Sequence, residues 1–176
     1  MIRVFIYWTL LGGVLLASCV DEGIPTEQDF LKVPADWDAP DFPEDNALTK
    51  ARWELGKKLF YETDLSRDAS ISCASCHDPA IAFSDHVAVS LGVENRLGRR
   101  NAPTLANVAY HPYFTREGGV PTLEMQVLVP LQEHDEFDFN IVLAAERLQE
   151  REEYRAMSRE AYESPVDAFV ITRALG

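Results

Sequence analysis

The stretch CASCH at residues 73–77 contains the side chains whose types and spacing can do chemistry. Two thiols, Cys73 and Cys76, are separated by two residues, and His77 follows at once. This is the spacing at which two thiols add to the vinyl groups of a haem while the histidine ligates its iron. A redox-active disulfide and a zinc site are alternatives for the same residue types.

The rest of the sequence supports these alternatives less well. A disulfide between Cys73 and Cys76 would close a loop too small to stabilise much of the chain. Redox-active Cys-x-x-Cys pairs usually open a helix in a βαβ unit, and no strand pattern lies nearby. Zinc would need a further histidine, and no second Cys/His pair occurs at zinc-binding spacing. The candidates are His86, His111 and His134. We therefore expect one covalently bound haem c.

The N-terminus indicates export. Arg3 precedes an apolar run over 4–16, which is the layout of a secretory signal and is too short for an ordinary membrane span. Residues 16–19, LASC, also match a bacterial lipobox, in which Cys19 is lipidated. We predict a lipoprotein signal peptide over 1–18 and a periplasmic or other extracytoplasmic protein that is anchored to the membrane by lipid. A plain anchor helix, or a cleavable signal with an incidental cysteine, is the alternative.

The chain is acidic, with 16 Lys and Arg against 29 Asp and Glu, and its formal net charge is −13. We expect no nucleic acid partner, because the phosphates would be repelled. Solubility is the simplest reason for this charge. Attraction to a basic redox donor is the alternative.

We predict a tether followed by one globular domain. Residues 19–45 are acidic and contain four prolines, which is typical of an extended linker. The domain should then occupy 46–176. Apolar residues recur at helical spacing at its start and predict an amphipathic helix over 46–62. The segment 78–100 has weak periodicity and should be irregular, covering the haem face.

Two helices are expected in the middle of the domain. Asn101 ahead of Ala-Pro is a helix start signal, which predicts a short helix to about Tyr110. The stretch VPTLEMQVLVP predicts a second helix over 120–130 that Pro130 ends or kinks.

Further helices are expected towards the C-terminus. Asn140 should cap one of them, and the charged stretch over 149–163 either continues it or forms another. Ser164 and Pro165 should begin the last helix, whose apolar face includes Phe169. No convincing alternation of apolar and polar residues predicts a strand, so the expected fold class is all-α.

Four longer stretches fit one common pattern. They are LGKKLFYETDLSRDASISCASCHDPAIAFSD, SLGVENRLGRRNAPTLANVAY, LEMQVLVPLQEHDEF and VITRALG, which together span roughly residues 52 to 176. In order and spacing they resemble the bacterial dihaem cytochrome c peroxidases and their MauG-like relatives. The resemblance implies a cytochrome c-like haem domain, specifically the N-terminal, peroxidatic one of two. The chain therefore looks truncated, with the second haem domain missing after Gly176.

The resemblance also implies roles for single residues. His77 matches the proximal ligand of the haem iron. Gln126 and Pro130 match the distal glutamine and proline, and Glu136 matches the glutamate that acts as acid and base. Asn101, in RRNAPT, matches the side chain that binds an interdomain calcium, whose other ligands would come largely from the second domain. Calcium is thus an open second cofactor.

The implied reaction is the reduction of hydrogen peroxide to water with electrons from a small redox protein, a cytochrome or a cupredoxin. A carboxylate can take the proton of the incoming peroxide and return it to the departing oxygen. An amide beside it can hold the peroxide or a water in line. A MauG-like protein substrate is the alternative to peroxide. The sequence leaves open whether the protein forms a homodimer.

The sequence departs from the family pattern at two positions. Val93, in SLGV, stands where many members carry a distal histidine, and His86 lies too early to replace it. A valine cannot ligate iron, so this coordination position should be open. Arg116, in FTREGG, stands where the family usually has the tryptophan that lies between the two haems. An arginine cannot be oxidised as an indole can, which puts ordinary electron transfer between haems in doubt.

Two other functions stay open at this point. A monohaem electron-transfer cytochrome c would use Met125 as the sixth iron ligand. Met125 and Gln126 are adjacent on one expected helix and should point about 100° apart, so both can hardly face the iron. Core packing is the simpler role for Met125. In the third reading the chain binds haem poorly, because its domain interface is missing.

Overall fold

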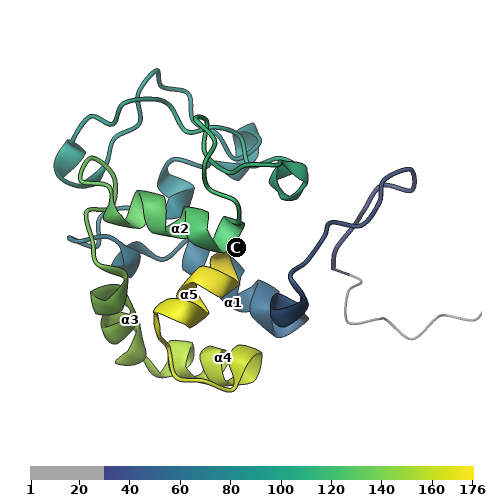
Figure 1. Cartoon of the computed structure of the whole chain (residues 1–176). Helices are drawn as coiled ribbons and strands as arrows, with labels where there is room; N and C mark the ends of the chain where they lie inside the picture. Colours follow the sequence, from purple (N-terminus) through teal and green to yellow (C-terminus); the bar gives the residue numbers. More distant parts are fainter. Residues whose placement is uncertain (1–29) are drawn as a thin grey trace, which may run out of the picture.

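A computed structural model describes residues 30–176 of the protein (Figure 1). Cys19 and the predicted signal peptide over 1–18 lie outside the described residues. Within 30–176, α-helices are joined by short 3-10 turns and irregular segments, and the β-pairing consists of two isolated bridges. The all-α prediction is confirmed for this part of the chain. Over the same residues, no helix has the length and apolar character needed to cross a membrane.

The α-helices are α1 (Lys50–Phe60), α2 (Leu123–Gln132), α3 (Ile141–Gln149), α4 (Glu152–Tyr162) and α5 (Ala168–Leu175). The 3-10 turns are η1 (Glu44–Asn46), η2 (Thr63–Leu65), η3 (Cys73–Ser75), η4 (Pro79–Ile81), η5 (Val93–Asn95) and η6 (Val108–Tyr110). In Figure 1, α2 lies between the long irregular segment that precedes it and the group formed by α3, α4 and α5. The CASCH motif belongs to this irregular segment, and its Cys73 packs against the core.

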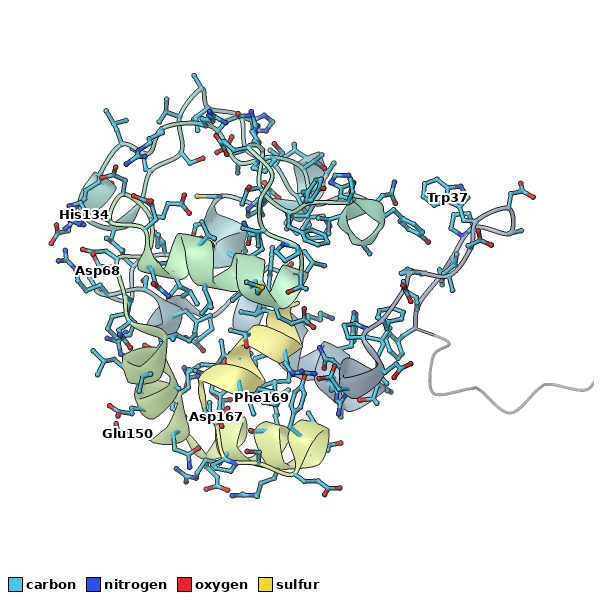
Figure 2. The ribbon with its side chains drawn as sticks, viewed as in Figure 1. Trp37, Asp68, His134, Glu150, Asp167 and Phe169 are labelled. Carbon is cyan, nitrogen blue, oxygen red and sulfur yellow. The ribbon has the colours of Figure 1, made fainter. Side chains whose placement is uncertain are left out.

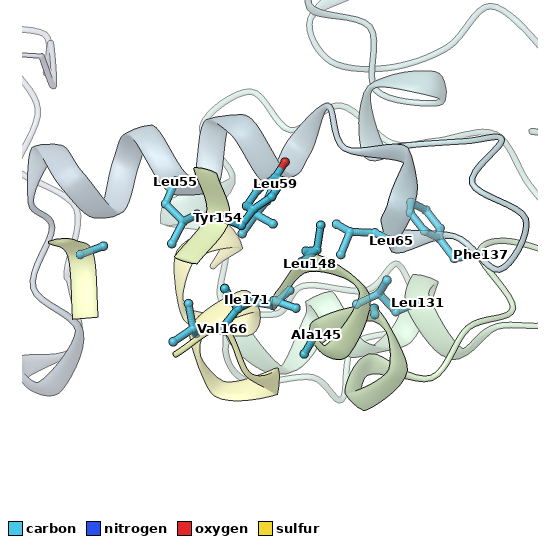
Figure 3. Packing of buried hydrophobic residues seen from close by; sticks show 13 residues of the cluster. Leu55, Leu59, Leu65, Leu131, Phe137, Ala145, Leu148, Tyr154, Val166 and Ile171 are labelled. Carbon is cyan, nitrogen blue, oxygen red and sulfur yellow. The ribbon is translucent and has the colours of Figure 1, made fainter. Parts of the chain in front are cut away.

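One apolar core joins all five helices (Figure 3). Leu55 and Leu59 from α1, Leu148 from α3, Tyr154 from α4 and Ile171 from α5 are almost completely removed from solvent. Burying a leucine or isoleucine side chain of this kind contributes about 1.5–3 kcal/mol. The core therefore gives α2 and the turn after it a rigid support.

The helices α1 and α5 cross at very short range. A Cβ built on Gly56 would lie 1.9 Å from the carbonyl oxygen of Ala174, which no side chain can accommodate. Glycine is required here for close approach, although it is a weak helix former.

The helix predicted over 120–130 is α2, and Pro130 does not end it. Thr122 caps its first turn, because the side chain accepts a hydrogen bond from the backbone N–H of Met125 at 3.2 Å. The helix continues for two residues beyond Pro130. The proline ring lacks an N–H, so its helical bond to the carbonyl four residues earlier is absent, and the remaining bonds and the core keep the turn.

The prediction of a helix from Asn101 to Tyr110 was wrong. Only η6, over the last three of these residues, is helical. The Asn101 side chain accepts a hydrogen bond from Arg116 and does not cap a helix. The backbone N–H of Ala102 is already used by Asp85 Oδ2 at 3.2 Å. Long-range contacts thus replace the local bonds that a helix would need.

The helices after α2 follow the prediction with one shift. The Asn140 side chain accepts from the backbone N–H of Val142 at 2.8 Å and caps α3 as expected. The charged stretch forms a separate helix, α4. The prediction that Ser164 and Pro165 begin the last helix was wrong, because α5 begins three residues later with Asp167 as its cap.

The described half of the segment predicted as a tether contacts the helical part of the chain. Phe30 packs on Trp53 of α1 with ring centroids 5.3 Å apart. Trp37, which is labelled in Figure 2, lies on the N-terminal arm formed by residues 30–45. Its ring meets that of Tyr110 edge to face, with ring centroids 5.1 Å apart. The Tyr110 hydroxyl donates to the carbonyl oxygen of Asp38 at 2.8 Å. These contacts fix the arm against the loop that contains η6.

Candidate haem site

The CASCH motif folds as a tight 3-10 turn, η3. The Ser72 backbone N–H donates to the Ser75 hydroxyl at 3.0 Å, and the His77 backbone N–H donates to the carbonyl oxygen of Cys73 at 2.9 Å. Both thiols are free and half-buried, with no disulfide between them. The turn therefore presents Cys73 and Cys76 as separate nucleophiles next to one imidazole.

Both thiols are held in the protonated state at neutral pH. Desolvation by the surrounding protein raises the pKa of Cys73 to about 12. Desolvation also raises the pKa of Cys76, and the negative charges of Asp85 and Glu136 add to this shift. Thiols that exchange disulfides have lowered pKa values instead. The raised pKa values thus give no support to the redox-disulfide alternative.

The imidazole of His77 has a defined tautomer. Its Nδ1 lies 2.8 Å from the carbonyl oxygen of Phe83. A carbonyl can only accept, so Nδ1 carries the proton and Nε2 keeps a free lone pair for a metal. Ala82 and Phe83 both have positive φ angles of 58° and 56°, which turn the chain back towards the histidine. The turn is closed by the Phe83 N–H, which donates to the Asp78 carbonyl at 2.8 Å.

These features fit a c-type haem. Two free, protonated thiols stand at the attachment spacing, and the adjacent histidine is oriented by a backbone acceptor, as metal-ligating histidines usually are. Across residues 30–176, no group of three or more His, Cys, Asp and Glu side chains is placed to hold a metal ion. The zinc alternative therefore gains no support in the described part of the chain.

Gln126 and Pro130 lie on one face of α2. They are four residues apart and both are half-buried. The Gln126 side chain is partly accessible to solvent, and its amide has no hydrogen bond to another side chain within residues 30–176. Pro130 connects this face to the turn after the helix, because its carbonyl oxygen accepts from the Phe137 N–H at 3.2 Å.

Glu136 lies in that turn and is held against the loop that contains η5. Its backbone carbonyl oxygen accepts a hydrogen bond from the Val93 N–H at 2.9 Å. Val93 is completely buried. The side chain of Glu136 reaches solvent, but nearby protein atoms raise the pKa of its carboxyl group by desolvation, and Glu133 and Asp135 add to the effect.

The loop and the turn meet at backbone distance. A Cβ built on Gly92 would lie 2.1 Å from the carbonyl oxygen of Asp135 and 2.7 Å from that of Glu136. The Cys76 sulfur lies 3.9 Å from the carbonyl oxygen of Leu91 in the same loop. The structure therefore brings together three parts that are distant in sequence, namely the thiol turn, the loop at 91–93 and the turn that carries Glu136.

Met125 lies on a different face of α2. Its side chain is 53% exposed and lines a groove of about 360 Å³, which Phe169 and Arg173 of α5 also line. Gln126 is not among the residues that line this groove. The two adjacent side chains are thus separated, as the helical geometry predicts.

Asn101 and Arg116 are paired with each other. The Arg116 Nη2 donates to Asn101 Oδ1 at 2.9 Å, and an ion pair between Arg100 and Glu117 lies beside it. The oxygen expected to bind calcium therefore already accepts from a guanidinium group. His86, which was considered as a zinc ligand and as a distal haem ligand, is exposed in the loop before η5.

Comparison with known proteins agrees with this geometry. The sequence model of the family described as "Di-haem cytochrome c peroxidase" matches residues 50–176. The chain belongs to this family. Its members include cytochrome c peroxidases and MauG oxidoreductases that bind c-type haem. The match begins at the first residue of α1 and contains every proposed site residue except Cys19.

Curated relatives of the family are similar over most of this chain. The methylamine utilization protein MauG of Methylorubrum extorquens is 31% identical, covering 99% of this chain and 53% of its own length. The cytochrome-c peroxidase IdrP2 of Denitromonas iodatirespirans is 42% identical over 65% of this chain and 32% of its own length. This family member thus spans about half or less of the curated relatives it matches.

Solved structures share the fold. A MauG-like protein associated with microbial copper homeostasis superposes with a TM-score of 0.76 at 30% identity, covering 81% of this chain and 43% of that one. The diheme peroxidase BthA from Burkholderia thailandensis superposes with a TM-score of 0.64 at 25% identity, covering 74% of this chain and 38% of that one. The helical fold and the family assignment therefore agree.

Sequence reasoning missed two features of the site. The acceptor for His77 is a backbone carbonyl, which leaves no trace in residue types. The ion pairs of Asp138 with Arg67 and Arg96 join residues more than forty positions apart, and only the acidic turn EHDEFD signals that charges gather there.

Proposed function

We propose that residues 46–176 form the N-terminal, peroxidatic haem domain of a dihaem cytochrome c peroxidase. One haem c would be bound by thioether bonds to Cys73 and Cys76 and ligated by Nε2 of His77. The proposal depends most on one observation. Glu136, whose carboxyl group has a raised pKa, is joined through its backbone carbonyl oxygen to the backbone N–H of Val93, a buried residue that cannot ligate iron.

The chemistry divides between the cofactor and the protein. Haem, when bound, supplies the redox centre at which the O–O bond of peroxide is reduced. Glu136 accepts a proton from the incoming hydrogen peroxide and returns it to the departing oxygen, which then leaves as water. Two electrons and two protons complete the conversion of hydrogen peroxide into two water molecules. A general acid-base group works best with a pKa near the working pH, so the upward shift at Glu136 favours this role.

Gln126 and Pro130 complete the distal side in this proposal. The Gln126 amide can donate one hydrogen bond and accept another, which would orient peroxide or water for proton transfer. The Pro130 ring has no N–H, so it adds an apolar wall without a competing donor. Met125 is 53% exposed in the groove with Phe169 and is not part of the buried core, so the expected core-packing role was wrong, and its separation from Gln126 favours a peroxidase over an electron-transfer cytochrome.

The partners follow from the same proposal. Hydrogen peroxide is the substrate, and a small redox protein, a cytochrome or a cupredoxin, supplies electrons. The net charge of −13 suits a donor with a basic surface. The protein would act in the periplasm or another extracytoplasmic space, with a lipid on Cys19 attaching it to the membrane. The relatives are about twice as long as this chain or longer, which leaves room for a second haem domain. That domain would receive electrons from the donor and pass them to the haem at Cys73 and Cys76.

The guanidinium group of Arg116 would compete with calcium for the side-chain oxygen of Asn101. Asn101 would bind the ion through Oδ1, which now accepts from Arg116. Calcium binding therefore requires the guanidinium group to move away. The same Arg116 cannot act as an oxidisable bridge between haems, so electrons would need another route.

The test uses the full chain made with a cytochrome c maturation system. Haem should remain on the protein through denaturing electrophoresis, and the double change Cys73→Ala and Cys76→Ala should abolish the haem stain. In a single turnover with hydrogen peroxide, Glu136→Gln should keep the haem spectrum but slow the reaction by about 10²-fold, the scale of a lost acid-base group.

The control is Glu160→Gln, which removes an exposed carboxyl group from α4, away from Glu136, and should leave the rate within a few-fold. Equal rates for wild type and Glu136→Gln would reject the catalytic role. A low-spin haem with a sulfur-to-iron charge-transfer band that is lost in Met125→Ala would identify an electron-transfer cytochrome instead.

A further inference from the structure

A network of charges joins the loop at η5 to the turn that carries Glu136. Arg96 is at its centre. Its Nη1 donates to Asp138 Oδ2 at 2.7 Å and to the carbonyl oxygen of His134 at 2.7 Å. Its Nη2 donates to Glu94 Oε2 at 2.6 Å. One guanidinium group thus binds both ends of the turn and the preceding part of its own loop.

Arg67 adds a second cation to the same two carboxylates. Its Nη1 lies 3.2 Å from Asp138 Oδ2 and its Nη2 lies 2.5 Å from Glu94 Oε1. Its backbone N–H also donates to the carbonyl oxygen of Phe137 at 3.0 Å. We call the side chains of Arg67, Glu94, Arg96 and Asp138 the Arg96 network. His134, at the edge of the molecule in Figure 2, contacts this network through its carbonyl oxygen and through its imidazole, whose Nδ1 lies 3.1 Å from Arg96 Nη1 and 3.4 Å from Asp138 Oδ1.

The Arg96 network encloses the backbone contact that holds Glu136. The acceptors of Arg96 belong to residues 134 and 138, which flank Glu136 on both sides. On the loop side, the Arg96 carbonyl oxygen accepts from the Gly92 N–H at 2.9 Å, and the Arg96 N–H donates to the Val93 carbonyl at 3.1 Å. Loss of the network would therefore free both partners of the Val93–Glu136 bond.

The network is more than an ordinary surface ion pair. Isolated exposed pairs contribute little, but this one combines two cations, two carboxylates and a backbone acceptor. The side chains of Arg96 and Asp138 are only 20% and 23% exposed. The hydrogen bond to Arg96 is the main cause that lowers the pKa of the Asp138 carboxyl group.

The backbone on both sides of the contact is in an unfavourable conformation. Glu94, Asn95 and Asp138 have positive φ angles of 56°, 58° and 48°. Residues other than glycine adopt this region at a cost and need surrounding contacts to keep it. The Arg96 network supplies such contacts to the loop and to the turn at once.

We propose that Arg96 and Asp138 are positioning residues that hold the turn of Glu136 against the loop of Val93, and so place the Glu136 carboxyl group for proton transfer. The proposal rests on the catalytic role of Glu136 given above. Neither residue needs to touch the substrate. Both act through the geometry of the turn.

The test uses the haem-loaded full chain and two readouts. Arg96→Gln and Asp138→Asn each remove one charge of the central pair, and Asn tolerates the left-handed conformation at 138. Amide hydrogen exchange of residues 91–97 should become about tenfold faster in both variants, the scale expected for losing a charge-assisted hydrogen bond. Single-turnover reaction with hydrogen peroxide should slow by about tenfold while the haem spectrum stays unchanged.

A double-mutant cycle separates positioning from general damage. In a Glu136→Gln background, Arg96→Gln should cause no further slowing, because its effect passes through the missing carboxyl group. Arg100→Gln is the matched control, since Arg100 follows the same loop but its ion pair is with Glu117 and not with the turn of Glu136, so it should change neither readout. If Arg96→Gln does not fold, Asp138→Asn gives the decision.

The outcomes distinguish the two proposals. In one outcome Glu136→Gln reacts slowly with peroxide, while Arg96→Gln and Asp138→Asn keep the wild-type reaction rate and the wild-type amide exchange. This outcome would overturn the positioning role alone. Rate losses that multiply in the double variant would also overturn it. A wild-type rate in Glu136→Gln would remove the proposed function and the positioning role together.

Discussion

The Val93 N–H donates to the carbonyl oxygen of Glu136 at 2.9 Å, although the two residues are 43 positions apart. This bond joins the backbone of a residue that cannot ligate iron to the backbone of the proposed acid-base residue. Gly92 makes the contact possible, because a Cβ there would lie 2.1 Å from the Asp135 carbonyl oxygen. The relation gives the first of five predictions.

Gly92→Ala should separate the loop from the turn of Glu136. The new Cβ has no room, so we expect the free energy of unfolding to fall by about 1–3 kcal/mol, the usual cost of overpacking. Peroxide reaction in a single turnover should slow as well, because Glu136 moves. Gly98→Ala is the control, since its Cβ would meet its first neighbour at 3.1 Å and should cost less. Denaturant unfolding and stopped-flow absorbance measure the two effects, and equal behaviour of both variants would contradict the prediction.

Tyr154→Phe should destabilise the helical core. The Tyr154 hydroxyl donates to Glu62 Oε2 at 2.6 Å, and Arg151 Nη1 contacts the same oxygen at 2.7 Å. Removing the hydroxyl leaves a largely buried carboxylate with one donor fewer, which should cost about 1–3 kcal/mol at pH 7. Tyr61→Phe, at a half-exposed position, should cost almost nothing. Equal losses of unfolding free energy in the two variants would show that the hydroxyl does not matter.

The same pair predicts a pH dependence. Desolvation acts to raise the pKa of Glu62, but the hydrogen bond from Tyr154 and the nearby Arg151 lower it overall. A carboxyl group whose folded pKa is lowered adds stability above its unfolded pKa, and this stability is lost as the pH falls through the folded pKa. The difference in unfolding free energy between wild type and Tyr154→Phe should therefore shrink on acidification. A difference that grows at low pH would contradict the assignment.

Arg116→Gln should strengthen calcium binding if Asn101 is a calcium ligand. The arginine donates to Asn101 Oδ1 at 2.9 Å and brings a positive charge to that oxygen. Replacing it removes both the competition and the repulsion, so calorimetric titration with Ca²⁺ should show affinity about tenfold or more above wild type. Asn101→Ala in the same background should abolish the gain. Unchanged heats in Arg116→Gln would reject Asn101 as a ligand.

Phe169 should drive self-association of the chain. It is 55% exposed on α5 (Figure 2) and lines two shallow apolar grooves, one with Val142 and Val166 and the other with Met125 and Leu128. Covering a phenylalanine contributes about 1.5–3 kcal/mol, so Phe169→Gln should weaken self-association by about tenfold. Light scattering and binding of a hydrophobic dye measure the effect. Leu97→Gln, at a 70% exposed position elsewhere, is the control, and a monodisperse wild type would reject the prediction.

Local sequence was sufficient for part of the molecule. The attachment motif CASCH, the helix at α1, the cap at Asn140 and the helix at α2 could be predicted, because each depends on residues within a few positions of one another. A capping side chain reaches backbone groups two or three residues away, and an apolar stripe repeats every turn. Such signals are complete in a short window of sequence.

Tertiary structure decided the rest. Asn101 carries a helix start signal, yet its side chain binds Arg116 and no helix forms there. The His77 tautomer depends on a carbonyl six residues later that positive φ angles turn towards it. Glu136 meets Val93 only because Gly92 lets two backbones approach and because Arg96 holds Asp138. Such contacts depend on the free energy of the whole fold, in which long-range bonds outweigh local preference, so no short window of sequence could contain them.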